Sequence, residues 1–173
     1  LHPEGYEKQA RYKQDLKQYQ IGREGDLLIP PNGYAMVEGF QSFDHPVRID
    51  SFQPHGHLRM NAASLEVFHP ETGRTEPISQ ISNWSATWHH SHIYNPDVAP
   101  LLPTGAVLIL KQWYDNTSNN PNVTDPDQYV PWGSRTADEM NHAWIAVTHL
   151  DDEGYEKLVA ERQEREQRSV AVD

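Results

Sequence analysis

The feature that most constrains the fold is a series of short apolar runs that are separated by turn residues. The runs cover 34–43, 47–53, 58–68 and 76–81, and Gly, Pro and Asn residues lie between them. Short runs at this spacing, with no long helical segments between them, are typical of an antiparallel β-sandwich. The most apolar run, 106–110, continues to Tyr114 and indicates a central core strand. The sequence therefore predicts an all-β antiparallel sandwich.

The 173 residues suffice for one domain with a hydrophobic core. We expect an N-terminal arm over 1–25, the β-sandwich over 26–150 and a charged C-terminal helix or tail over 151–173. In the first arm, apolar side chains at helical spacing predict a short amphipathic helix. In the second, Glu and Arg four residues apart favour a solvated helix. Short helical arms are thus predicted at both ends.

Composition excludes several function classes. The formal net charge of −11 disfavours nucleic acid and anionic membrane surfaces as partners. The sequence has no cysteine, which excludes disulfides and thiolate metal sites. No apolar run approaches the roughly 20 residues of a transmembrane helix. Because the sequence begins at Leu1 rather than methionine, we expect a leader, an anchor or a further domain to precede it.

Two histidines, His55 and His57, follow the alternating run 47–52. If the strand continues, both side chains project from the same face. Neutral imidazole is the commonest protein ligand for copper, zinc and related metals, so this pair predicts a metal site. The alternative is a chance pairing, since the chain has ten histidines.

A second pair, His90 and His92, lies in the aromatic stretch 84–94. On a strand these two imidazoles share one face, and His89 points the other way. The functional interpretation is a second metal site or another wall of the first. The alternative, a polar and aromatic surface strand, is favoured because no clear partner ligand follows.

A turn over 132–139 leads to Met140 at the start of an apolar strand, where His142 and Trp144 share its face. The preceding loop, 115–127, is rich in oxygen side chains. A calcium site there lacks the usual spacing of ligands, so a loop held by Asx turns is favoured.

Five blocks of the sequence, in order, resemble the C-terminal domain of the copper type II, ascorbate-dependent monooxygenases. That family includes peptidylglycine α-hydroxylating monooxygenase, dopamine β-monooxygenase and bacterial relatives. The blocks are 52–59, 83–94, 102–105, 114–121 and 132–140. The resemblance implies a jelly-roll-like β-sandwich that holds one oxygen-binding copper ion through His55, His57 and Met140. A thioether ligand favours Cu(I), the state that reduces oxygen.

The sequence departs from the family in three respects. Gly56 replaces a methionine of the bacterial relatives, at a position that we expect to face away from the metal. Trp144 stands where the peptide-processing members carry a tyrosine. The family binds a second copper ion through three histidines of a separate N-terminal domain. We expect no room for that domain within these 173 residues.

These features predict a copper-binding β-sandwich within a larger periplasmic or extracellular assembly of protein partners. If it is an enzyme, it is a copper-dependent monooxygenase that hydroxylates a C–H bond with electrons from ascorbate or a redox partner. The alternative is a non-catalytic structural or interaction subunit of a membrane-associated electron-transfer complex, with vestigial metal binding. A third possibility is copper storage or delivery.

Overall fold

The structure is a computed structural model, and it describes residues 14–19 and 27–170, with side chains for 27–168. Strands make up most of the regular structure, and one long helix follows them. The elements are β1 (Gln14–Tyr19), β2 (Leu28–Ile29), β3 (Tyr34–Ser42), β4 (Val47–His55), β5 (Met60–His69), β6 (Arg74–Ser82), β7 (His92–Ile93), β8 (Leu101–Leu102), β9 (Val107–Asp115), β10 (Val130–Pro131), β11 (His142–His149) and α2 (Asp152–Val170).

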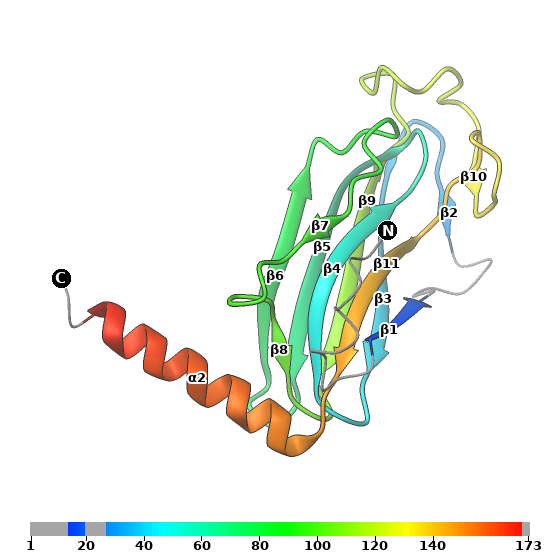
Figure 1. Cartoon of the computed structure of the whole chain (residues 1–173). Coiled ribbons are helices and arrows are strands. Elements are labelled where there is room, and N and C mark those ends of the chain that lie inside the picture. Colours follow the sequence, from blue (N-terminus) through cyan, green and yellow to red (C-terminus); the bar gives the residue numbers. More distant parts are fainter. Residues whose placement is uncertain (1–13, 20–26, 171–173) are drawn as a thin grey trace.

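Two antiparallel sheets face each other (Figure 1). One has the order β1-β11-β4-β7, and β8 also pairs with β4; the other has the order β3-β9-β5-β6. A two-stranded ribbon of β2 and β10 lies at the end of the sandwich where β4 and β9 finish. The predicted all-β antiparallel sandwich is confirmed.

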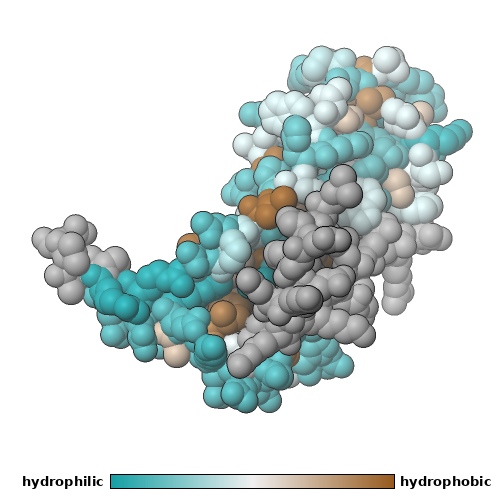
Figure 2. Space-filling view, viewed as in Figure 1, coloured by the Kyte–Doolittle hydropathy of each residue, from teal (hydrophilic) through white to brown (hydrophobic). Residues whose placement is uncertain are grey.

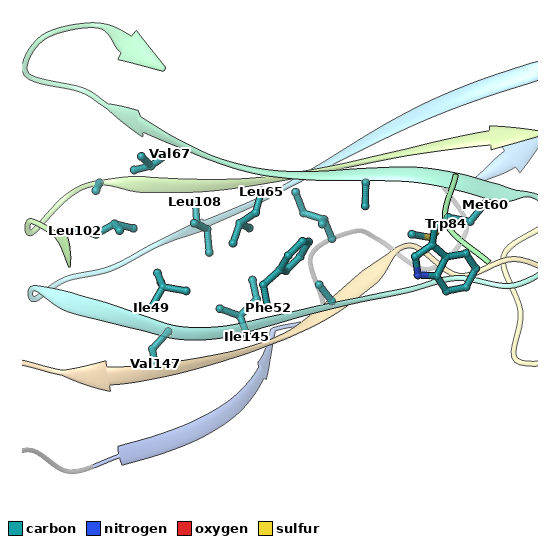
Figure 3. Close-up of a cluster of buried hydrophobic side chains, with 14 of the residues drawn as sticks. Ile49, Phe52, Met60, Leu65, Val67, Trp84, Leu102, Leu108, Ile145 and Val147 are labelled. Atoms are coloured by element: carbon teal, nitrogen blue, oxygen red, sulfur yellow. The ribbon is translucent and has the colours of Figure 1, made fainter. Parts of the chain in front are cut away.

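The core lies between the two sheets, as Figure 3 shows. Strand β9 alternates regularly between buried and partly buried residues, because successive side chains of a strand point to opposite faces. Its buried residue Leu108 lies across the core from Phe52 and Ile145 of the opposite sheet, and Leu110 belongs to the same buried cluster. The predicted central strand is therefore a core strand that packs across the sandwich.

The N-terminal helix prediction is wrong for Gln14–Tyr19, which form strand β1. These residues pair with β11, from Gln14 opposite Thr148 to Tyr19 opposite Ala143. The predicted helix has few apolar side chains at helical spacing, so little burial was available to stabilise it. Pairing with the edge of β11 instead satisfies the backbone groups of both strands. The remainder of the predicted arm lies outside the described residues.

The expected strand over 84–94 is also wrong for most of its length. Only His92–Ile93 forms a strand, β7, opposite Ser51 and Phe52 of β4. At the start of the segment Asn83 has a positive φ of 55°, a left-handed conformation that interrupts an extended strand. The segment 84–91 is therefore a loop across one end of the sandwich.

The predicted C-terminal helix is confirmed as α2. The Asp151 side chain accepts a hydrogen bond of 2.7 Å from the Gly154 amide, which caps the first turn. The ion pair of Arg165 with Asp97, at 2.8 Å, ties the helix to the loop before β8. Most of the visible surface of α2 is hydrophilic (Figure 2). Within the described part of the chain, no helix is long and apolar enough to cross a membrane.

Candidate metal centre

His55 and His142 lie opposite each other at one end of the sandwich. They are the last residue of β4 and the first residue of β11, and they are direct partners in the ladder between these strands. Their rings stack with centroids 4.6 Å apart and planes at 28°. Trp144 contacts both rings edge-on, with centroid distances of 5.0 Å to His55 and 4.8 Å to His142. Strand pairing thus brings together two imidazoles that are 87 residues apart in the chain.

His57 lies just beyond β4, and its ring is 5.4 Å from that of His55 between centroids. Its Nδ1 is 2.9 Å from the backbone oxygen of Asp138. A carbonyl oxygen only accepts, so Nδ1 carries the proton and donates it. The neutral ring then presents Nε2 as its lone-pair nitrogen, which is the arrangement that orients metal-binding histidines in proteins.

The carboxylate of Glu139 fixes the loop that carries His57. Glu139 is fully buried, and its oxygens accept hydrogen bonds from four backbone amides. The donors are His57 at 2.7 Å, Arg59 at 2.5 Å, Met60 at 3.3 Å and Met140 at 3.3 Å. We call this arrangement the Glu139 clamp. It joins the two predicted ligand segments through one side chain.

The turn before the clamp is closed by an ion pair. Arg135 donates from Nε and Nη2 to the two carboxylate oxygens of Asp138, at 2.8 and 2.6 Å. This bidentate contact lowers the pKa of Asp138. A side chain at position 133 would collide with Asp138, because an added Cβ lies 2.7 Å from its Cγ. Gly133 therefore allows the turn to pack tightly enough for the Asp138 carbonyl to reach His57.

Buried polar groups support both sides of the centre. The Tyr114 hydroxyl donates a 2.8 Å hydrogen bond to the Met140 carbonyl oxygen. Arg59, which is 5% exposed, donates from Nη1 to the backbone of Ala137 at 2.9 Å and from Nε to Asn116 at 3.2 Å.

The loop after β9 is held by Asx-type contacts, such as the hydrogen bond of 2.8 Å from the Thr117 amide to the Asp115 carboxylate. The favoured interpretation of that loop is thus confirmed.

Burial dominates the electrostatics of the centre. Burial, together with the smaller effects of the neighbouring His142, His89 and His57 rings, lowers the pKa of His55 to about 4. Burial, and then His57, also lower the pKa of His142. Both imidazoles are therefore neutral near pH 7, the form that binds metals. Burial raises the pKa of Glu139, and the amide hydrogen bonds of the clamp offset part of that rise.

Two ring nitrogens at the centre are buried without a hydrogen-bond partner, namely Nδ1 of His55 and Nε2 of His142. A buried polar atom without a partner is destabilising by roughly 1–3 kcal/mol, and a metal ion bound at either nitrogen would remove that penalty there. The residues therefore fit a metal that prefers nitrogen ligands. Among residues 14–19 and 27–170, however, no group of three or more His, Cys, Asp or Glu side chains is already arranged to hold one. The predicted set of two imidazoles and a thioether contains only two such residues.

The structure brings together some of the histidines whose roles the sequence left open, and separates others. His89 approaches the centre, with its ring 5.0 Å from His55 and stacked 5.7 Å from Trp84. His90 and His92 are exposed, and no strand aligns them as a pair on one face. Both histidines thus lie at the surface, as the favoured alternative expected, but only His92 is in a strand. The Glu139 clamp was missed, because sequence does not reveal which amides converge on a carboxylate.

Comparisons with known proteins yield no matching family model and no matching curated protein.

Proposed function

We propose that this protein is a copper-binding β-sandwich in which His55, His57 and Met140 hold one copper ion. The observation that carries the proposal is a buried His55 nitrogen without a partner, beside a His57 ring whose Nδ1 proton is engaged by a backbone carbonyl. The Nδ1 atom of His55 thus lacks a hydrogen-bond partner, and the His57 ring is oriented to offer Nε2. Met140 follows directly after the residue that clamps His57.

The donor set favours copper over harder cations. Calcium and magnesium require several oxygen ligands, yet the nearby carboxylates are already engaged. The Glu139 oxygens accept backbone amides, and the Asp138 oxygens bind Arg135. The nitrogen and thioether groups that remain suit copper in both oxidation states.

When bound, copper would supply one-electron chemistry with oxygen. The chain's own residues hold and orient the ligands: the Asp138 carbonyl fixes the tautomer of His57, and Tyr114 and the Glu139 clamp fix the backbone of Met140. The resemblance to copper monooxygenases supports a periplasmic or extracellular assembly and, if the protein is an enzyme, hydroxylation of a C–H bond. A second source of electrons would then come from a partner protein or from ascorbate.

The test is the copper content of the purified protein after loading and desalting, in the parent and in His57→Ala. The variant keeps the backbone amide that Glu139 binds, so the clamp and the fold are expected to remain. His45→Ala is the matched control, because His45 contacts His149 at the opposite end of the same strands. One copper per chain that is lost only in His57→Ala supports the proposal. Equal copper in all three proteins, or none in any, contradicts it.

A second candidate, a structural or interaction subunit, is favoured by the outer face of β3. Three large apolar side chains alternate along this edge strand and are exposed: Tyr34 at 65%, Met36 at 49% and Phe40 at 60%. A row of exposed apolar residues on one strand is a feature of protein-binding surfaces. If assembly is the function, Phe40→Lys will abolish co-purification with a native partner while copper content is unchanged, and His57→Ala will leave assembly intact. The reverse pattern contradicts this candidate.

A further inference from the structure

We infer that the free edge of β3 pairs with the β3 edge of a second copy of this chain, so that two four-stranded sheets join into one continuous sheet across a dimer. The inference goes beyond the copper site and uses none of its residues. It names a partner for the β3 surface on which the second candidate function rests.

Strand β3 is a long and regular edge. It is the outermost strand of its sheet, and among the strands that the structure describes only β9 pairs with it in that sheet (Figure 1). The pairing with β9 runs through all nine residues without a shift in register. Glu38 is its one charged residue, and it contains no proline. An edge of this kind presents a row of backbone amides and carbonyls that another strand can bind.

The other edges of the two sheets carry features that prevent such pairing. At the far edge of the same sheet, β6 contains Pro77, and its pairing with β5 shifts register between Leu65 and Glu66. In the opposite sheet, β1 carries Asp15 and Lys17, and β7 is only two residues long. Proline, bulges, charges and short strands are the usual protections of a sheet edge. The contrast indicates that the β3 edge is kept open for a partner.

The side chains of β3 are complementary to those of a second β3 strand in one register. If the two-fold axis passes through Val37, antiparallel pairing places Tyr34 of each copy opposite Phe40 of the other, and Met36 opposite Glu38. Aromatic cross-strand pairs stabilise a sheet. The register shifted to an axis through Glu38 would instead place two carboxylates directly opposite each other, which is destabilising. Both effects favour the axis through Val37.

The size and charge of this interface indicate a reversible dimer. A whole aromatic side chain offers about 150–250 Å², so the four rings of a dimer, exposed by 65% for Tyr34 and 60% for Phe40, supply up to roughly 500 Å². With the paired backbone, this area belongs to the small interfaces below about 1,200 Å². Each copy has a formal charge of −11, but Glu38 is ion-paired with Lys111 of the adjacent strand at 3.6 Å. At about 0.15 M salt, exposed charges more than about 8 Å apart are largely screened.

The experiment is sedimentation equilibrium over a series of protein concentrations at about 0.15 M salt. Two doubly substituted chains are compared with the parent, namely Tyr34→Lys/Phe40→Lys and Tyr34→Glu/Phe40→Glu, and circular dichroism checks their fold. Tyr129→Lys is the matched control, because this tyrosine is 62% exposed and lies outside β3. The parent and the control should approach twice the chain mass of 19.9 kDa as concentration rises.

Each charged chain alone should remain a monomer, because like charges then face each other on both sides of the axis. An equimolar mixture of the two should form a dimer again, because every lysine then faces a glutamate. This rescue is specific to the register in which position 34 lies opposite position 40.

A parent that stays monomeric at every concentration overturns the inference, as does a parent that forms oligomers of no fixed size. A dimer that survives in either charged chain, that is lost in Tyr129→Lys, or that the mixture fails to restore also overturns it. Copper content separates this outcome from failure of the proposed function. It should be equal in the parent and both charged chains, whereas His57→Ala should lose copper and still form the dimer.

Discussion

Replacement of Gly56 by alanine is expected to destabilise the fold by about 1–3 kcal/mol, the usual range for an overpacked core. Gly56 is buried between the two proposed histidine ligands, and a Cβ added to it would lie 2.7 Å from the Cβ of Met60 and 3.1 Å from its Cγ. Its φ is outside the positive region, so the expected penalty is steric and owes nothing to backbone strain. Met60 cannot move aside freely, because it is 2% exposed and its sulfur accepts a 2.8 Å hydrogen bond from Gln112.

The same geometry predicts that Gly56 and Met60 are energetically coupled. Met60→Ala alone should destabilise by about 2–5 kcal/mol, since it leaves a cavity in the core. In the double variant the methyl group at position 56 has room and fills part of that cavity. The loss of stability in the double variant should therefore be smaller than the sum of the two single losses, by about 1 kcal/mol or more.

The assay is urea unfolding followed by circular dichroism, with all four proteins of the cycle measured without metal. Met36→Ala is a control, because this methionine is 49% exposed and its removal should change stability little. If the two single effects add to within about 0.5 kcal/mol, the packing argument is wrong. Copper binding by a folded Gly56→Ala should equal that of the parent, since the added methyl points toward Met60 and the core.

Three further predictions address the clamp, its support and the metal. Glu139→Gln should destabilise the fold by about 2 kcal/mol in urea unfolding, because the NH2 group that replaces one oxygen cannot accept from two of the four backbone amides. The control is Glu71→Gln at an exposed position, which should be neutral, and equal stability of the two variants contradicts the clamp. Tyr114→Phe should cost about 1 kcal/mol, because it removes the hydrogen bond to the Met140 carbonyl, and a variant as stable as the parent would show that this bond is dispensable. Copper at a hundredfold excess over its dissociation constant should raise the free energy of unfolding by about 2.7 kcal/mol, a gain that a chelator removes and that His57→Ala never shows; a similar gain in that variant places the metal elsewhere.

The strand pattern was predictable where one face is buried and the other is not. Strands β4 and β9 were predictable from the alternation of apolar and polar residues, because alternate side chains point into the same core. The pattern was misleading where neighbours decide the outcome. Gln14–Tyr19 carries helix-compatible spacing, but the edge of β11 makes a strand the better conformation. Local spacing carries no information about an unpaired edge more than a hundred residues away.

The candidate site was predictable in part for the same reason. His55 and His57 are two residues apart in sequence, so their proximity follows from local geometry alone. The stacking of His142 on His55 depends on the register between β4 and β11, which a sequence pattern does not fix. A signal was available, because a strand that continued back to Met140 would place the His142 imidazole on the methionine's face. The position of this imidazole beside His55 became clear only from the pairing of β11 with β4.

The three residues of the Asp-Glu-Met segment, 138–140, have different roles in the candidate site. Of its three members, only Met140 is a proposed ligand. Asp138 orients His57 through its backbone oxygen, and Glu139 holds the amides on either side of the centre. The His57 amide and the Glu139 carboxylate are 82 residues apart in the chain, yet one 2.7 Å hydrogen bond joins them. Any change that loosens this carboxylate should therefore disturb His57 and Met140 together, and metal affinity should fall more steeply than the loss of one isolated ligand contact would suggest.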